Sequence, residues 1–233
     1  MRVPLLANIT ESDSILAQEL RSEFGRRGIL VINMIASPGA GKTTLIERTI
    51  EGLRGELRVG VVEGDLATNL DAERIAAVGA PAVQITTGSG CHLEARMVRA
   101  ALGTLDLDGL DLLIVENVGN LVCPTAWDLG EDLRVVVASL TEGDDKPLKY
   151  PAAFATAHAV VINKIDLEPY VPARVSVLRE NALRIKGSLA IFEISCITGQ
   201  GLDEWLEWVR REAARKRSAG EGDRSDVKGM ESA

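Results

Sequence analysis

The chain has 233 residues, of which 46% are apolar, and a formal net charge of −8. This length and apolar content suffice for one sizeable hydrophobic core in a single domain. The acidic balance, with no basic stripe on any expected helix, excludes a typical nucleic-acid-binding protein. The longest apolar run is too short to cross a bilayer, so no membrane partner is expected. Three scattered cysteines, and a start unlike a signal peptide, indicate a reducing, cytoplasmic setting.

Strand and helix patterns alternate along the chain after a leading helix expected from Asn8 to Phe24. Such alternation predicts an α/β fold in which a mainly parallel sheet of about seven strands is covered by helices on both faces, giving three layers. The folded domain is expected to span residues 1–216, and the polar segment 217–233 is expected to be a disordered tail. Strands are expected at 30–36, 58–63, 83–86, 112–116, 134–139, 159–163 and 189–195, and further helices at 43–53, 71–78, 92–103, 173–185 and 202–215.

The first motif lies between an expected strand and an expected helix. In this context its glycines, Gly39 and Gly41, let backbone N–H groups turn toward phosphates, as in the P-loop of nucleotide-binding proteins. Lys42 brings a positive charge to the phosphates, and the Thr43 hydroxyl is placed to bind magnesium. A P-loop NTPase fold is therefore expected, although alanine stands at the first position of the usual pattern. The motif reads Ser37-Pro38-Gly39-Ala40-Gly41-Lys42-Thr43-Thr44.

The second motif, Asn163-Lys164-Ile165-Asp166, follows an apolar strand and selects the base. A carboxylate at Asp166 can accept from the ring N–H and the exocyclic amine of guanine together, a donor pair that adenine lacks. Lys164 is expected along the base, and Asn163 is expected to brace the loop. Alone this motif would be an ordinary turn, but with a P-loop upstream it predicts GTP binding. A further loop, Ser195-Cys196-Ile197-Thr198-Gly199, is expected to support the base.

A third strand end fits the chemistry of magnesium and the γ-phosphate. The strand at 112–116 ends in Glu116, and Gly119 follows, where many GTPases have Asp-x-x-Gly. In that arrangement the acid binds magnesium through water and the glycine N–H senses the γ-phosphate, although glutamate here is one methylene longer. Because Asn120 rather than glutamine follows Gly119, no water-positioning side chain is evident and slow GTP hydrolysis is expected.

A second acidic candidate follows the strand at 58–63. Asp65 is expected near the magnesium or the attacking water, because open α/β sheets bind ligands at the carboxyl ends of their strands. Asp71 is a weaker candidate on the same loop. The alternative for these acids is an ordinary solvated loop position. Catalysis is assigned to Lys42, Asp65 and Glu116, and magnesium binding to Thr43, Asp65 and Glu116.

Soft ligands distinguish this chain from a generic GTPase. Cys91 and His92 are expected at the start of the helix at 92–103, where a helix N-terminus lowers the pKa of a thiol. Cys123 lies on the segment that follows Gly119 and is expected to move with the γ-phosphate. Thiolate and imidazole suit nickel, zinc or copper rather than magnesium, and a closed site would need a water or a second chain. The alternative is that both cysteines are ordinary core residues, and their spacing alone does not decide.

Together these motifs resemble the HypB family, the nickel-incorporation GTPases of NiFe-hydrogenase maturation. The resemblance extends from roughly residue 10 to 210, and its most specific parts are the cysteine–histidine pair and the Val-Cys-Pro segment. The matching segments are the P-loop motif, Glu63-Gly64-Asp65, Cys91-His92-Leu93-Glu94-Ala95, the segments 116–124 and 141–151, and Asn163-Lys164-Ile165-Asp166.

The resemblance implies that Cys91, His92 and Cys123 bind nickel or zinc near a homodimer interface. It also implies that GTP promotes the dimer and that hydrolysis is coupled to metal delivery, to the hydrogenase large subunit or a nickel-handling accessory protein. With no cysteine before Cys91 and only two histidines, a separate high-affinity nickel store is not expected. The nucleotide would contact Gly39, Ala40, Gly41, Lys42, Thr43, Thr44, Gly119, Asn163, Lys164, Asp166, Ser195 and Cys196.

Other functions stay open at this point. Urease nickel-insertion GTPases have similar nucleotide motifs but carry Cys-Pro-His where this chain has Cys123-Pro124-Thr125. A GTP-gated protein chaperone without metal transfer would need neither Cys91 nor Cys123. A P-loop kinase would leave Asp166 without a role, so it is the weakest alternative.

Overall fold

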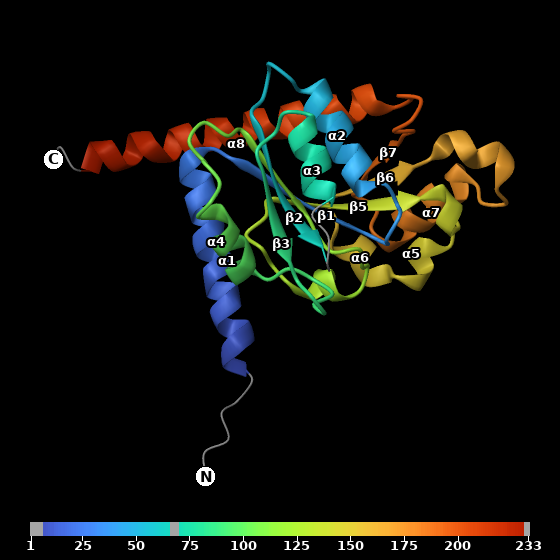
Figure 1. Cartoon of the computed structure of the whole chain (residues 1–233), viewed down its shortest axis with the longest axis horizontal. Coiled ribbons are helices and arrows are strands. Elements are labelled where there is room, and N and C mark those ends of the chain that lie inside the picture. The colour runs from blue at the N-terminus through green and yellow to red at the C-terminus, as the bar shows by residue number, and fades with distance from the viewer. Residues whose placement is uncertain (1–6, 66–69, 231–233) are drawn as a thin grey trace, which may run out of the picture.

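The computed structural model describes residues 7–65 and 70–230, and describes side chains within 11–65 and 70–220. Seven parallel strands form one sheet in the order β3-β2-β4-β1-β5-β6-β7 (Figure 1). All seven expected strands are present, so the predicted α/β fold is confirmed. The strands are β1 (Leu30–Ala36), β2 (Val59–Asp65), β3 (Ala82–Thr86), β4 (Leu112–Glu116), β5 (Leu133–Ser139), β6 (Ala159–Asn163) and β7 (Ala190–Glu193).

Side chains of the central strands alternate between two apolar layers, as the period of two in a strand requires. In β1, Ile32 and Met34 pack on one side of the sheet, and Val31 and Ile35 pack on the other. Both faces are buried, which explains why these strands read as continuous apolar runs rather than as alternating patterns. The sheet is therefore the middle layer of the three predicted.

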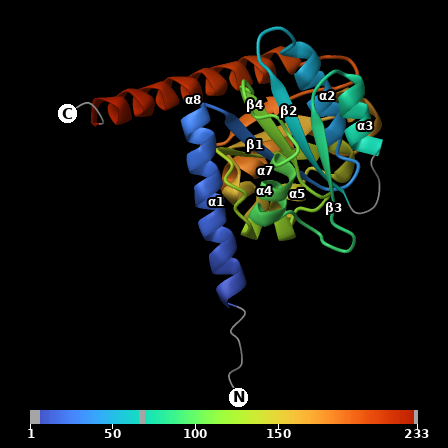
Figure 2. The same ribbon diagram turned by 60° about the vertical axis from the view of Figure 1, so that its left-hand side comes forward.

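Helices cover both faces of the sheet (Figures 1 and 2). One face packs against α2 (Lys42–Gly52), α3 (Leu70–Ala77) and α8 (Leu202–Met230). On the opposite face α1 (Ala7–Arg27) and α4 (Ala95–Leu102) cover the β2–β4 side, and α6 (Pro151–Thr156) and α7 (Val175–Ile185) cover the β5–β6 side. Short helical segments complete the chain: η1 (Cys123–Ala126), η2 (Leu140–Glu142), α5 (Lys146–Lys149) and η3 (Ile165–Tyr170).

The last helix differs from expectation. A helix was predicted over 202–215 and a disordered tail from 217, but α8 continues to Met230. Contacts with the domain hold the first part of this extension: Lys216 pairs with Asp132, and Arg217 pairs with Asp111 at 2.8 Å. Gly220 lies so close to α1 that a Cβ atom there would be 2.7 Å from a backbone oxygen. The C-terminal end of α1 therefore meets α8, and the two helices run in different directions away from this contact (Figure 2). The predicted start of the tail falls within a helix. Within the described residues, no helix is long and apolar enough to span a membrane.

The strand register brings the predicted motifs to one edge of the sheet. Glu116 at the end of β4 lies opposite Met34 of β1 on one side and Glu63 of β2 on the other. Asn163 at the end of β6 lies opposite Ser139 of β5. Because all these strands run in parallel, the P-loop after β1 joins the acidic strand ends and the Asn-Lys-x-Asp loop at this edge.

Candidate functional site

The P-loop connects β1 to α2 through two glycines with left-handed backbones. Gly39 has φ 75°, and Gly41, which caps the N-terminus of α2, has φ 96°. Both values are accessible to glycine at little steric cost. The loop therefore presents backbone N–H groups and a helix N-terminus, which is a geometry suited to an anion. Lys42 and Thr43 begin the helix and are largely buried.

A cleft of about 470 Å³ lies over this loop. It brings residues from five separate segments of the chain together, among them the predicted phosphate and magnesium residues. The lining includes Gly39, Gly41, Lys42, Thr43, Thr44, Asp65, Asp71, Arg74, Glu116, Gly119 and Lys164. Asp71 belongs to α3 rather than to a loop as predicted, and it pairs with Arg74 at 3.1 Å. Arg74 was not predicted, because only the packing of α3 against α2 brings it here.

Glu116 occupies the bottom of the cleft. Its Oε1 accepts a hydrogen bond from Thr43 Oγ1 at 3.1 Å and lies 3.7 Å from Lys42 Nζ. Its Oε2 is buried and meets no nitrogen or hydroxyl donor among the described residues. A buried carboxylate beside a threonine hydroxyl, with Asp65 lining the same cleft, is an oxygen donor set of the kind that Mg²⁺ prefers. These residues fit a magnesium ion.

Glu63 is a buried acid that the sequence analysis did not assign to the site. It lies beside Glu116 in the β2–β4 register and is 2% exposed, and a hydrogen bond between the two carboxyl groups requires that one of them carries a proton. Burial, and after it the charge of Glu116, raises the pKa of Glu63 to about 10. Burial also raises the pKa of Glu116, against the opposing effect of the Lys42 cation. In the folded chain Glu63 is therefore protonated at neutral pH.

This proton predicts how stability depends on pH. Between the ordinary Glu pKa of 4.5 and about 10, the folded chain holds a proton that the unfolded chain releases. Stability of the nucleotide-free protein should therefore fall as pH rises, by at most about 1.4 kcal/mol per pH unit. Between pH 6 and 9, the melting temperature of Glu63→Gln should fall less than that of wild type. Calorimetric scans at each pH test this. Glu56→Gln is the control, because the hydrogen bond with Arg210 lowers the pKa of Glu56, so this residue titrates below the window. Parallel pH profiles for wild type and Glu63→Gln would contradict the assignment.

The predicted base-binding loop lies beside the P-loop. A second cavity of about 310 Å³ is lined by Asn163, Lys164, Asp166 and Cys196 and shares Gly41, Thr44 and Lys164 with the phosphate cleft. Asn163 Nδ2 donates to the Ala40 carbonyl at 3.0 Å. A Cβ atom on Gly41 would lie 2.4 Å from that same nitrogen, so only glycine fits there.

Lys164 adopts a conformation unusual for its residue type. Its φ is 64°, the one left-handed value among the described non-glycine residues. Such strain persists where surrounding contacts determine the conformation, and it concentrates at ligand sites. Here Lys164 N donates to Asn163 Oδ1 at 2.8 Å and Lys164 Nζ donates to the Gly39 carbonyl at 2.8 Å.

Ala40 and Ser195 line neither cavity. Ala40 is buried and supplies the carbonyl that holds Asn163, and Ser195 Oγ accepts from Thr198 N at 3.1 Å within its own turn. Burial raises the pKa of the Cys196 thiol to about 11, so this cysteine is a neutral wall of the base cavity. These residues shape the site rather than offer charge to it.

Cys91, His92 and Cys123 come together as the sequence analysis expected for a soft-metal site. Their ligand atoms all lie within 4.8 Å of one another, and Cys91 Sγ is 3.6 Å from His92 Nδ1. All three side chains are partly buried. Two sulfurs and one imidazole nitrogen are a donor set that fits nickel or zinc, with room for further ligands from water or another chain.

The predicted low pKa of Cys91 is wrong. The helix begins at Ala95 rather than at His92, so Cys91 lies in the preceding loop and outside the helix dipole. The hydrogen bond with Cys123, and then burial, raise the pKa of Cys91 instead. The helix starts late because its cap comes from α1: both carboxylate oxygens of Asp13 accept from the backbone N–H groups of Ala95 and Arg96.

Side-chain amides connect the nucleotide cleft to the cysteine–histidine cluster. Asn117, which follows Glu116, accepts hydrogen bonds from Leu93 N at 3.1 Å and Val118 N at 3.0 Å through one oxygen. Asn120 Oδ1 accepts from the backbone of Val122 and Cys123. Asn120 therefore supports the turn that presents Cys123, which gives a structural reason for asparagine at the position after Gly119. Gly119 itself packs against Pro38 of the P-loop.

Comparisons with known proteins agree with this architecture. The model of the CobW/HypB/UreG nucleotide-binding domain matches residues 30–193. Hydrogenase maturation factor HypB of Escherichia coli K12 is 45% identical over 202 residues, covering 87% of this chain and 70% of the relative. The chain belongs to the HypB family. The hydrogenase/urease maturation factor HypB of Helicobacter pylori is 41% identical, covering 89% of this chain and 86% of the relative.

A solved HypB structure has the same fold. HypB from Helicobacter pylori in complex with nickel superposes with a TM-score of 0.84 at 39% identity, covering 88% of this chain and 97% of that structure. The match confirms the predicted P-loop fold across nearly the whole domain. The family therefore shows a nucleotide-binding domain, and the assignment of individual residues rests on the geometry above.

Proposed function

We propose that this protein is a GTP-hydrolysing metallochaperone that delivers nickel during NiFe-hydrogenase maturation. The observation that carries the proposal is the contiguity of two sites. The segment from Glu116 to Cys123 begins at the bottom of the phosphate cleft and ends at a thiol of the Cys91–His92–Cys123 cluster. Relatives named hydrogenase maturation factor, and a nickel complex of one HypB, support the choice of pathway and metal.

Nucleotide selection is proposed to rest on Asp166, which lines the smaller cavity next to Lys164. GTP and magnesium would engage Lys42, Thr43, Asp65 and Glu116, with intrinsic hydrolysis slow because no glutamine follows Gly119. The γ-phosphate would attract the backbone N–H of Gly119, and Cys123 would move with the same backbone segment. Hydrolysis then changes the ligand geometry at the soft-metal cluster and releases the metal.

A homodimer is part of the proposal, because one chain supplies only three soft ligands from the cluster. A second copy would double that number around a shared metal. The recipient would be the hydrogenase large subunit or a nickel-handling accessory protein, in the cytoplasm. Zinc is the competing metal, since the same ligands suit it.

One comparison suggests urease as a second client protein. The Helicobacter pylori relative is named a hydrogenase/urease maturation factor, so urease maturation is the alternative use of the same switch. This chain has Cys123-Pro124-Thr125 rather than the Cys-Pro-His of urease-type GTPases. That difference favours the hydrogenase. A GTP-gated chaperone without metal transfer would be indifferent to loss of both cysteines.

Equilibrium dialysis tests this by measuring the nickel bound per chain, first with a non-hydrolysable GTP analogue and then with GDP. Light scattering gives the mass of the protein in each sample. The analogue should give a dimer whose nickel affinity or stoichiometry differs from that of the GDP form. Cys91→Ser/Cys123→Ser is the control. If wild type binds no more nickel than this variant in either nucleotide, metal delivery is not its function. If Cys123→Ala leaves nickel affinity equally sensitive to GTP and GDP, the coupling through this segment fails.

A further inference from the structure

The imidazole of His92 is held by a ring that no sequence motif indicated. Trp127 stacks on it with the ring centroids 4.6 Å apart and the planes at 18°. Trp127 belongs to the loop after η1, some distance along the chain from the Cys91–His92 pair. Offset stacking of this kind fixes the plane of a ring that could otherwise rotate about its side-chain bonds.

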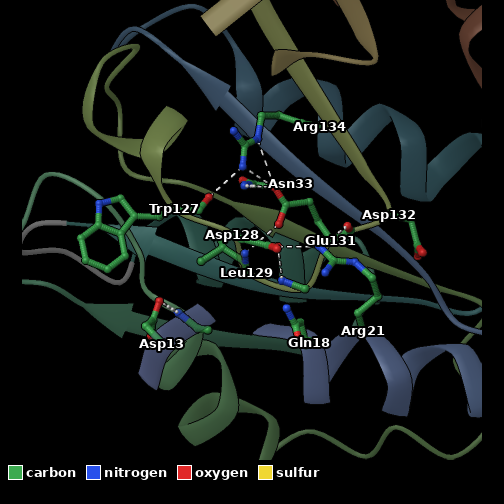
Figure 3. A network of polar contacts seen from close by, with 12 residues as sticks. Asp13, Gln18, Arg21, Asn33, Trp127, Asp128, Leu129, Glu131, Asp132 and Arg134 are labelled. Atoms are coloured by element: carbon green, nitrogen blue, oxygen red, sulfur yellow. Dashed lines mark hydrogen bonds and ion pairs between the residues drawn. The ribbon is translucent and has the colours of Figure 1, made fainter. Parts of the chain in front are cut away.

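Trp127 is in turn held by a buried ion pair (Figure 3). Arg134 of β5 donates to the Trp127 carbonyl at 2.7 Å and to the Thr125 carbonyl at 3.0 Å. The same guanidinium contacts Glu131 Oε1 at 2.6 Å, and both side chains of the pair are less than a tenth exposed. Glu131 also accepts from Asn33 Nδ2 and Leu129 N. The backbone that carries Trp127 is thus attached to the centre of the sheet.

The stacked orientation distinguishes the two nitrogens of His92. Nδ1 points to the thiols and lies 3.6 Å from Cys91 Sγ. Nε2 is buried without a hydrogen-bond partner among the described residues, and Glu94 Oε1 lies 3.8 Å from it. A histidine that binds a metal through one nitrogen commonly directs its other N–H to a carboxylate, which fixes the tautomer and the ring.

We infer that Trp127 is a positioning residue for the soft-metal site, which holds the His92 ring so that Nδ1, rather than Nε2, faces the metal beside Cys91 and Cys123. Glu94 then lies on the side of the free Nε2–H. This inference rests on the proposed metal site and adds to it the residue that orders its imidazole. Trp127 itself contributes no ligand atom, so its effect must pass through His92.

Cobalt(II) is the probe, because its thiolate and d–d absorption bands report both binding and ligand geometry. The full chain is titrated with cobalt in the presence of magnesium and a non-hydrolysable GTP analogue. Trp127→Ala should weaken cobalt binding by about tenfold or more, the usual size of an effect on a residue that orients a metal ligand. Trp127→Phe keeps a stacking ring, so it should bind within about threefold of wild type with unchanged d–d bands.

A double-mutant cycle separates this role from general loosening of the loop. In a His92→Ala background, Trp127→Ala should have no further effect on cobalt affinity. Thermal melts of every variant confirm that each is folded. The inference is overturned if Trp127→Ala binds cobalt like wild type, or if it loses the same factor with and without His92. If wild type itself binds no better than Cys91→Ser/Cys123→Ser, the metal site fails, and this inference fails with it.

Discussion

Replacing Lys42 with alanine is expected to lower the rate of GTP hydrolysis by about 10²–10³-fold, the usual loss when one preorganised charge-stabilising donor is removed from an active site. Lys42 is 8% exposed, and its Nζ lies 3.7 Å from Glu116 Oε1 in a cleft that Asp65 and Asp71 also line. Without this cation, the cations left in the cleft are Arg74, which is paired with Asp71, and Lys164, whose Nζ donates to the Gly39 carbonyl. Hydrolysis is measured by phosphate release under saturating GTP and magnesium.

Lys149→Ala is the matched control for this loss. Lys149 lies in α5, and its side chain is 60% exposed and paired with Asp145 on the surface. Its removal takes the same charge from the chain but not from the cleft. Hydrolysis by Lys149→Ala should remain near the wild-type rate. Equal losses in the two variants would mean that net charge, rather than the P-loop position, governs the rate.

The largest expected effect on stability is at Arg134. Arg134→Ala should lower the free energy of unfolding by about 3–5 kcal/mol, because it leaves Glu131 as an uncompensated charge and two backbone carbonyls without their donor. For a domain of this size the melting temperature should fall by about 6–20 °C. Thermal unfolding followed by circular dichroism measures the change.

Two further variants test the reason for that loss. Arg215→Ala removes a 68% exposed guanidinium that pairs with Glu212 within α8, so it should cost less than about 1 kcal/mol. Arg134→Met combined with Glu131→Leu should be more stable than Arg134→Ala alone, because no unpaired charge stays buried. If Arg134→Ala and Arg215→Ala were equally stable, the buried network of Figure 3 would contribute little.

The fold was readable from the sequence because its signals are local. The buried strands are largely apolar runs, and the P-loop glycines and Asn163–Asp166 stand directly at strand ends, where parallel sheets bind ligands. The metal trio was also predicted, since the ligand types are distinctive even though their meeting depends on tertiary structure.

What the sequence did not reveal depends on partners far along the chain. The start of α4 is set by Asp13 of α1, more than eighty residues earlier, so local capping rules place it too early. Glu63 becomes a protonated buried acid only because the β2–β4 register sets it beside Glu116. Trp127 meets His92 only after the loop beyond η1 folds back. No spacing rule connects these pairs.

The position of β1 has a consequence for how the chain acquires its fold during synthesis. β1 pairs with β4 on one edge and with β5 on the other, so neither of its partners exists when its seven residues, all but Asn33 apolar, emerge. At roughly 5–20 residues per second, completion of the strand that reaches Ser139 follows by several seconds. Until β4 is made, β1 has two open edges, and until β5 is made it has one, while α8, the last element, must still arrive to cover it. The P-loop that follows β1 therefore lacks its complete supporting sheet until β5 has emerged.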